Sequence, residues 1–297
     1  MKHARLAAVL ALIFLAVTAL PAQQTQHVVG FMTDFDVKDD AIGICKAVME
    51  TIDPGVRIID ISHQVTPYDI AEGARFLAGS APYFPADAVF VVVIDPTVGS
   101  ARKAIIAHSR RGQFFVLPDN GLLTLFPTTG ENQIIEAREI TNTAWMIGAR
   151  LSSTFHGRDI FSPAGAHLAR GDNWTQAGPA LDVAKLVRLD LHNPTLDPTG
   201  LVTQVLGLDG PFGNVILNVP SETFAKLGYH LGDPVPVTID GHPYTVPFVK
   251  TFSDVPVGSP LLYIDSRGRV ALSLNQRNFA EKYHVNPGLA VSIPMKR

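Results

Sequence analysis

Asp69, Arg75 and His156 are of the residue types that can bind a water molecule and remove its proton. An arginine lowers the effective pKa of a nearby water by its charge, and a histidine or an aspartate takes the proton. Asp69 and Arg75 are six residues apart on one segment of helical character, which is not the spacing of a simple surface pair. His156 lies in the polar stretch 155–159, which we predict to be a loop. A structural role and a catalytic role are both open for this histidine.

Asp34 directly follows an apolar stretch, residues 27–32, that we predict to be a strand. A carboxylate in this position can accept hydrogen bonds from two vicinal hydroxyls, as in ribose recognition. It can equally form an Asx-turn or cap a helix, and the sequence leaves both interpretations open. Asp39 and Asp40 stand at a predicted helix start, where the helix dipole favours acidic residues and simple capping explains them.

Two turns in the second half of the chain carry polar side chains of a similar kind. Residues 209–214, Asp-Gly-Pro-Phe-Gly-Asn, form a tight turn between predicted strands, and a plain hairpin loop accounts for it as well as a ligand does. Ser266 and Arg267 precede Gly268 in another turn, and a serine beside an arginine can hold a carboxylate.

Several catalytic signatures are missing from the sequence. It contains no GxGxxG or GxxxxGK[ST] in a suitable context, no HExxH and no GxSxG. These absences argue against use of a nucleoside triphosphate, zinc hydrolysis and the serine hydrolase class. The single cysteine, Cys45, excludes an internal disulfide, and the histidines lack metal-ligand spacing. We therefore predict no metal and no cofactor.

Three predicted strands of the first hundred residues end in polar side chains. Residues 90–94 form a continuous apolar, β-branched run that stops at Asp95-Pro96, as expected for a strand buried on both faces of a parallel sheet. Residues 27–32 and 56–61 end in the same way, and helical segments at 39–51 and 69–80 follow them. This order predicts a mostly parallel sheet, and ligands collect at the carboxyl ends of such strands.

The pattern changes to short strands separated by Gly and Pro after residues 189–199, a plausible linker. We predict an N-terminal α/β domain over 27–188 and a smaller C-terminal β-barrel or sandwich over 200–297. The expected strands of the second domain are 201–208, 214–219, 235–239, 244–249, 261–264, 270–274 and 290–293.

The first 24 of the 297 residues have the pattern of an export signal. Lys2, His3 and Arg5 precede an apolar run from Leu6 to Leu20, which is short for a membrane span, although an uncleaved anchor is the alternative. We expect a protein that is exported to the periplasm or secreted, with no membrane association after cleavage. The net charge is −3 and the basic residues are scattered, so no nucleic-acid surface is predicted.

Seven short motifs of this chain resemble those of the S-adenosyl-L-methionine (SAM) hydroxide adenosyltransferase family, whose relatives include the fluorinase and the chlorinase. They occur in family order at 33–39, 67–75, 95–99, 118–123, 155–159, 210–214 and 266–268. The resemblance implies an α/β domain followed by a β-barrel, and a homotrimer with sites between subunits. It also implies that water attacks C5′ of SAM and yields adenosine and methionine.

The resemblance assigns a role to individual residues by position. Asp69, Arg75 and His156 match the triad of the members that use water. Asp34 matches the ribose-binding acid, and Tyr68 and Phe155 match aromatic walls near the sulfonium. The other implied contacts are Asp39, Ser266 and Arg267 for methionine, Asp209 and Asn214 for the ligand, and Asn275 and Gln276 for adenine.

This chain departs from the family pattern at Asp36 and Thr97, where glycine is usual. The halogenases lack a residue equivalent to His156, and the fluorinase has a serine where this chain has Ala41, so the sequence favours water over halide. Two alternatives stay open: a catalytically silent exported protein that binds adenosine or SAM, and a SAM-dependent halogenase. Because SAM is cytoplasmic, an export signal also makes a leaked sulfonium nucleoside or the (R)-sulfonium epimer a candidate substrate.

Overall fold

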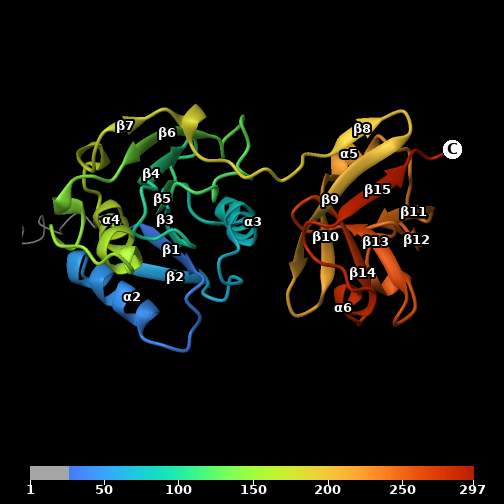
Figure 1. Cartoon of the computed structure of the whole chain (residues 1–297), viewed down its shortest axis with the longest axis horizontal. Helices are drawn as coiled ribbons and strands as arrows, with labels where there is room; N and C mark the ends of the chain where they lie inside the picture. The colour runs from blue at the N-terminus through green and yellow to red at the C-terminus, as the bar shows by residue number, and fades with distance from the viewer. Residues whose placement is uncertain (1–26) are drawn as a thin grey trace, which may run out of the picture.

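The computed structural model describes residues 27–297, which form two bodies side by side, each built around one sheet (Figure 1). The predicted export signal, residues 1–24, lies outside the described residues. Within residues 27–297, no helix is long and apolar enough to cross a membrane.

The first body contains seven strands and three α-helices within the described residues. The strands are β1 (Val28–Thr33), β2 (Arg57–Ser62), β3 (Val89–Val93), β4 (Ala104–Ser109), β5 (Phe114–Pro118), β6 (Ile134–Glu139) and β7 (Ala180–Leu181). The helices are α2 (Ala41–Ile52), α3 (Ile70–Ser80) and α4 (Ser162–Ala169).

The first sheet has the order β2-β1-β3-β5-β4-β6-β7, with parallel pairing from β2 to β5 and antiparallel pairing beyond. Helices α2 and α4 cover one face and α3 covers the other, because each presents an apolar stripe to the sheet. The chain leaves β1 toward β2 on one side and returns through β3 on the other. A crevice therefore opens at the carboxyl ends of β1 and β3.

The predicted strands and helices of this body are confirmed, with one correction. All five residues of β3 are buried, as a continuous apolar run requires in a sheet covered on both faces. The correction concerns 155–159, predicted as a loop: residues Gly157–Phe161 form a π-helical turn that runs directly into α4. The sequence gives little sign of it, because Gly157 and Asp159 are weak helix formers held here by tertiary contacts.

The second body is a nearly closed antiparallel barrel. Its strands are β8 (Thr195–Asp197), β9 (Gly200–Asp209), β10 (Asn214–Pro220), β11 (Pro234–Ile239), β12 (His242–Pro247), β13 (Pro260–Ile264), β14 (Arg269–Leu274) and β15 (Ala290–Pro294), with short helices α5 (Ser221–Ala225) and α6 (Phe279–Tyr283). The order is β12-β11-β15-β9-β10-β14-β13, and a bridge between Phe248 and Leu262 joins the two ends.

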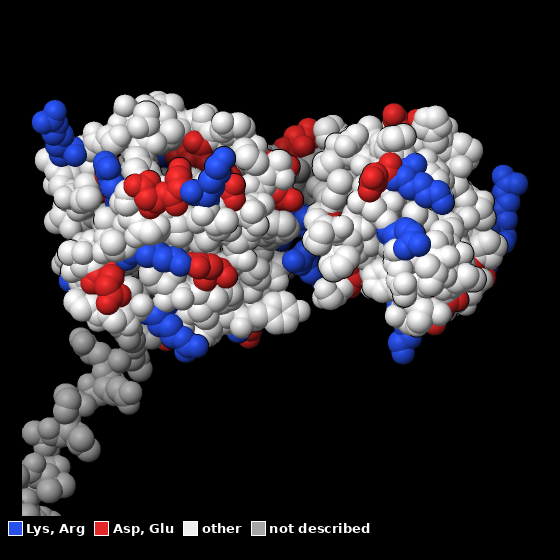
Figure 2. All heavy atoms as spheres, turned by 90° about the horizontal axis from the view of Figure 1, so that it is seen from below, with Lys and Arg blue, Asp and Glu red and all other residues white. Residues whose placement is uncertain are grey.

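The predicted β-barrel is thus confirmed, and its interior is filled by the alternating apolar side chains of the strands. The predicted linker, residues 189–199, is not entirely irregular, because β8 lies within it and pairs with β9. On the face shown in Figure 2, acidic and basic side chains are interspersed over both bodies, and basic atoms are also visible where the bodies meet.

Candidate functional site

A cleft of about 390 Å³ lies at the carboxyl ends of β1 and β3. We call it the first-domain cleft. The residues that line it come from four loops far apart in the sequence: Asp34, Phe35, Asp36, Pro67, Tyr68, Val93, Asp95, Val98, Thr154, Phe155, His156 and Gly157. The switch in strand order brings these loops together, and they include four of the residues that the sequence singled out: Asp34, Tyr68, Phe155 and His156.

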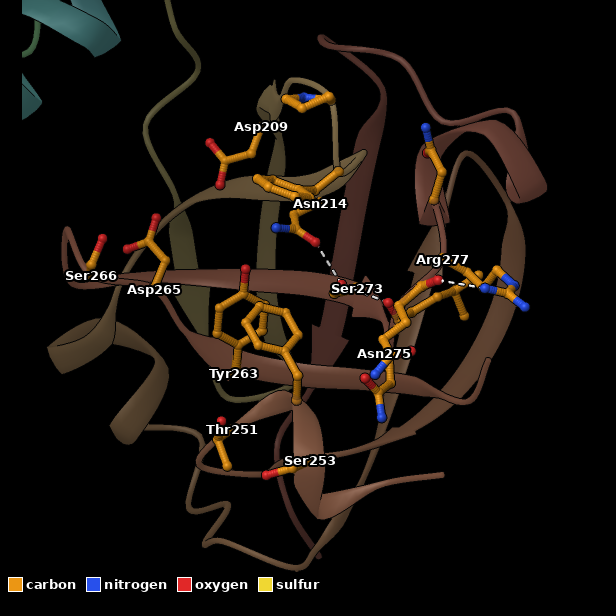
Figure 3. Close-up of a pocket in the computed structure, with 16 residues that line it drawn as sticks. Asp209, Asn214, Thr251, Ser253, Tyr263, Asp265, Ser266, Ser273, Asn275 and Arg277 are labelled. Atoms are coloured by element: carbon orange, nitrogen blue, oxygen red, sulfur yellow. Dashed lines mark hydrogen bonds between the residues drawn. The ribbon is translucent and has the colours of Figure 1, made fainter. Parts of the chain in front are cut away.

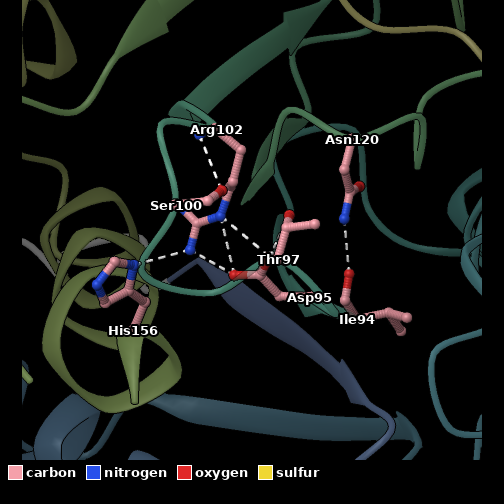
Figure 4. A network of polar contacts seen from close by, with 7 residues as sticks. All are labelled: Ile94, Asp95, Thr97, Ser100, Arg102, Asn120 and His156. Carbon is pink, nitrogen blue, oxygen red and sulfur yellow. Dashed lines mark hydrogen bonds and ion pairs between the residues drawn. The ribbon is translucent and has the colours of Figure 1, made fainter. Parts of the chain in front are cut away.

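One arginine joins an aspartate and a histidine at this cleft (Figure 4). Arg102 donates from Nε to the two carboxylate oxygens of Asp95, at 3.0 and 2.9 Å, and from Nη2 to the same carboxylate. Its Nη2 also lies 2.8 Å from Nδ1 of His156. The side chains of Arg102 and Asp95 are only 8% and 4% exposed, so the charges compensate each other away from bulk water.

His156 is held as a neutral ring in one tautomer. An arginine can only donate, so Nδ1 of His156 accepts and the hydrogen of the neutral ring is on Nε2. Burial and the positive charge of Arg102 lower the pKa of His156, and Asp95 opposes them only in part. The site therefore combines a permanent cation with an uncharged base at neutral pH.

Asp34 follows β1 and lines the same cleft. Its Oδ2 accepts a hydrogen bond of 2.9 Å from the backbone N–H of Tyr68, while burial raises the pKa of its carboxyl. Two residues of this rim, Asp36 and Tyr68, have the positive φ angles of 61° and 70° that non-glycine residues rarely adopt. The sequence resemblance implies glycine at position 36, and the positive φ of Asp36 is a conformation that glycine adopts without strain. Strained backbone of this kind is typical of binding sites.

The predicted grouping of Asp69, Arg75 and His156 is not found in this chain. Asp69 caps α3, because its Oδ1 accepts from the N–H of Glu72 at 2.9 Å. Arg75 is one and a half turns further along α3 and extends to the second domain, where it donates to Asp209. The segment forms a helix in which Asp69 caps the N-terminus and Arg75 contacts the second domain, so neither side chain is directed to His156. We correct the prediction: the partners of His156 are Asp95 and Arg102.

Sequence reasoning noted Asp95 as the end of a buried strand but did not assign it a role, and it missed Arg102. The spacing from Asp95 to Arg102 is seven residues across a loop, and no periodic pattern relates two positions on a loop. The available signal was topological: Asp95 follows β3 at the same edge as Asp34 follows β1.

The second domain has a larger pocket of about 970 Å³ (Figure 3). We call it the second-domain pocket. Five predicted residues line it: Asp209, Asn214, Ser266, Asn275 and Gln276. Sequence reasoning missed Phe252, Tyr263 and Arg277, which line it as well.

Two side chains of this pocket are held by the barrel. Oδ1 of Asn214 accepts from Ser273 Oγ at 2.5 Å, and the amide of Asn275 donates to the carbonyl of Val255 at 2.8 Å. Burial, together with the charges of Asp209 and Asp265, raises the pKa of Tyr263, so its hydroxyl keeps its proton. The pocket therefore offers fixed amides and a protonated phenol beside the carboxylates of Asp209 and Asp265.

Besides Asp69 and Arg75, two more predicted residues line neither cavity. Asp39 accepts a hydrogen bond of 3.1 Å from the N–H of Ala41, the first residue of α2, and so forms a local turn at the helix start. Arg267 lies beside Gly79 of α3. Within residues 27–297, no three His, Cys, Asp or Glu side chains are grouped so that they could hold a metal ion.

Comparison with known proteins identifies this arrangement. Models of the N-terminal and C-terminal domains of SAM hydroxide adenosyltransferases match residues 29–178 and 203–292. The chain belongs to the SAM hydroxide adenosyltransferase family. The two matched segments contain every lining residue of the first-domain cleft and of the second-domain pocket, so both cavities are part of the family fold.

Relatives of two kinds are similar over most of the chain. An (R)-S-adenosyl-L-methionine hydrolase of Salinispora arenicola is 39% identical over 88% of this chain and 95% of its own length. A fluorinase of Actinoplanes sp. is 32% identical over 90% of this chain and 97% of its own length. The crystal structure of an uncharacterized conserved protein from Thermotoga maritima has a TM-score of 0.83 at 35% identity, covering 89% of this chain and 99% of that one.

Gly99 allows the loop that carries Asp95 and Arg102 to lie against the segment that carries His156. It has φ of +77°, and a Cβ added there would overlap the backbone carbonyl oxygen of Ser153. We expect Gly99→Ala to lower both the melting temperature and the activity with SAM. Gly130→Ala is the matched control, because Gly130 has φ of +82° with open space around its Cβ position.

Both substitutions force alanine into the left-handed region, which costs about 1–2 kcal/mol. Only Gly99→Ala adds the overlap with backbone, and we expect it to cost at least about 1 kcal/mol more by thermal or urea unfolding. Equal losses of stability in the two variants would contradict the close approach of the two loops.

Proposed function

We propose that this protein hydrolyses SAM, in which water attacks C5′ and the products are adenosine and L-methionine. The arrangement of Asp95, Arg102 and His156 at the first-domain cleft is the observation that carries the proposal. The (R)-sulfonium epimer is the substrate we favour, because several similar relatives, including proteins of Salinispora tropica and Thermus thermophilus, are named (R)-S-adenosyl-L-methionine hydrolases.

The substrate already carries an excellent leaving group, so the enzyme has to align one oxygen nucleophile and exclude other water. Asp95 fixes the guanidinium of Arg102 through Nε and Nη2, and Nη1 forms no hydrogen bond within the described residues. We infer that water binds between Arg102 and His156. The water replaces Arg102 Nη2 as the partner of Nδ1 of His156, the guanidinium N–H groups donate to the water oxygen, and the freed lone pair on Nδ1 receives the proton.

The reaction then balances in one displacement. The water oxygen forms a bond to C5′, the C5′–S bond breaks with its electron pair on sulfur, and the proton moves to His156. The positive charge of Arg102 stabilises hydroxide character on the water as it attacks. Asp34 accepts from the ribose hydroxyls, and the rings of Tyr68 and Phe155 face the sulfonium.

We further propose a homotrimer in which the second-domain pocket of one copy covers the first-domain cleft of the next. The two cavities share no lining residue, and each has an exposed aromatic at its rim: Tyr68 is 74% exposed and Phe212 is 69% exposed. In this arrangement Asn275, Gln276, Asp209 and Asn214 contact the nucleoside. Asp39, Ser266 and Arg267 are proposed to hold the methionine part.

A water nucleophile predicts transfer of oxygen-18 from labelled water into the 5′-hydroxyl of adenosine. We expect label in the product, consumption of one sulfonium epimer, and no dependence on chloride. A chloride-dependent 5′-chloro product would identify a halogenase. Adenosine that binds but never forms would identify a silent binding protein, and either result would overturn the proposed hydrolysis.

Removal of the catalytic contacts is expected to reduce kcat. Asp95→Asn releases Arg102, and His156→Ala removes the proton acceptor, so we expect kcat to fall about 10²-fold or more in each. Asp69→Asn is the matched control, because asparagine also caps helices, and its kcat should stay within about threefold of wild type. A large fall in kcat in Asp69→Asn, with little change in Asp95→Asn, would instead make Asp69 the catalytic aspartate.

The pH dependence of kcat tests the protonation state of His156. The base works only when neutral, so activity is lost as pH falls through its pKa. Because burial and Arg102 lower that pKa from 6.5, we expect the acidic limb of kcat to lie below pH 6.5 and to disappear in His156→Ala. An acidic limb above pH 7 would contradict the proposed environment of this histidine.

Shared sites make a complementation test possible. His156→Ala damages only the cleft and Asn214→Ala only the pocket, so each homotrimer alone should have little activity. In mixed trimers formed by unfolding and refolding an equal mixture, about a quarter of all sites should be intact. Each site needs an undamaged cleft from one copy and an undamaged pocket from the next, and each of these is present with a chance of about one half. No recovery, or a monomeric mass by light scattering, would contradict the shared site.

Export of the protein remains a proposal that rests on residues 1–24. N-terminal sequencing of protein recovered from the periplasm or the medium tests it directly. A start near residue 25 is the expected result, and full-length protein confined to the cytoplasm would contradict it.

A further inference from the structure

Arg75 is a buried cation that crosses from the first domain into the second. It lies on α3 with a side chain only 2% exposed. Its Nη1 donates to Oδ1 of Asp209 at 2.9 Å, and its Nη2 donates to the carbonyl of Leu208 at 2.6 Å. Both acceptors are at the end of β9, in the barrel. A buried guanidinium needs such partners, so this contact ties α3 to one particular hairpin of the second domain.

A second arginine crosses the same junction in the opposite direction. Arg267, on the turn between β13 and β14, lies against α3 at Gly79 and places Nη1 3.9 Å from Oδ1 of Asp209. Two guanidinium groups from different domains therefore converge on one carboxylate. Within residues 27–297, they are the two arginines recorded in ion pairs with Asp209.

Each arginine lies against a glycine of the opposite domain. A Cβ added at Gly79 would be 2.5 Å from Nε of Arg267, and a Cβ added at Gly207 would be 2.9 Å from Nε of Arg75. Neither glycine has a positive φ, so backbone conformation does not demand glycine at these positions. Glycine is needed at both positions because a larger side chain would overlap the guanidinium groups.

Asp209 also lines the second-domain pocket (Figure 3). The same carboxylate that receives Arg75 thus borders the cavity, and Ser266, next to Arg267, lines it too. The contacts at the domain junction and the shape of the pocket are therefore linked through shared residues.

We propose that Arg75 and Arg267, with Gly79 and Gly207, form an interdomain clamp, and that Arg75 is a positioning residue for substrate binding by the second-domain pocket. The proposal rests on the proposed function, because it concerns the substrate of that site. Arg75 lines neither cavity. It acts through Asp209 by fixing the pocket relative to the first domain.

The clamp predicts a change in KM rather than in kcat. The Asp95, Arg102 and His156 contacts all lie within the first domain, so loss of the clamp leaves the chemical step intact but weakens binding. We expect Arg75→Met to raise KM for SAM about tenfold or more, with kcat within about threefold of wild type. Arg75→Lys restores a cation toward Asp209 and should recover part of the loss.

A fall in kcat with unchanged KM would instead make Arg75 a catalytic residue, and unchanged values of both would remove it from the site altogether. Either result overturns the clamp. Should Arg75→Met fail to fold, Gly79→Ala tests the same contact by displacing Arg267. Gly43→Ala is its matched control, because Gly43 is also helical and has nothing within 4 Å of its Cβ position. Because Arg267 is also proposed to hold the methionine part, KM alone does not decide for this variant. Faster amide hydrogen exchange at the junction in Gly79→Ala but not in Gly43→Ala supports the clamp, and equal exchange in the two variants counts against it.

A readout without substrate separates this proposal from the proposed function. Amide hydrogen exchange over residues 207–214 and 265–269 should be faster in Arg75→Met, or in Gly79→Ala, than in wild type, and unchanged in Gly43→Ala. This result is expected even if the wild-type protein hydrolyses no SAM, in which case only the proposed function fails. Unchanged exchange in these segments would overturn the clamp itself.

Discussion

The buried ion pair between Asp95 and Arg102 is the interaction on which the first-domain site depends. Both side chains are almost fully shielded from water, so burying either charge without the other would be costly. Their pairing fixes the loop that joins β3 to β4 and aims the guanidinium at His156, which comes from a segment more than fifty residues further along the chain. The ion pair thereby anchors a loop at the switch point of the sheet.

This arrangement solves a problem that a water nucleophile creates and a halide does not. A halide needs only to lose its hydration shell, whereas water must also lose a proton as its bond to carbon forms. A guanidinium supplies a permanent positive charge, and a neutral imidazole supplies a place for the proton. The chain is similar both to proteins named (R)-S-adenosyl-L-methionine hydrolases and to proteins named fluorinases.

The two domains contribute different things. The α/β domain provides rigid strand ends, and therefore the charged groups that need exact placement. The barrel provides amides and aromatic rings around a wide pocket, which suit a planar nucleoside. The junction between them is polar, built from arginines lying on glycines, and such a contact fixes an angle more specifically than an apolar interface does because it requires particular hydrogen bonds.

The sequence alone determined the elements and the order of the domains. Apolar runs such as 90–94 and 290–293 favour strands, and such runs can be recognised from neighbouring residues alone. It also placed Asp34 and His156 at a site, because both adjoin strand or helix ends. The partners of His156 were decided only by tertiary structure. Asp69 and Arg75 lie on one segment and were expected to act together. In the structure Asp69 caps helix α3, whereas Arg75 donates to Asp209 of the second domain. Asp95 and Arg102 meet His156 because sheet topology and Gly99 bring two distant loops together, and a contact between distant loops leaves no periodic trace in a single sequence.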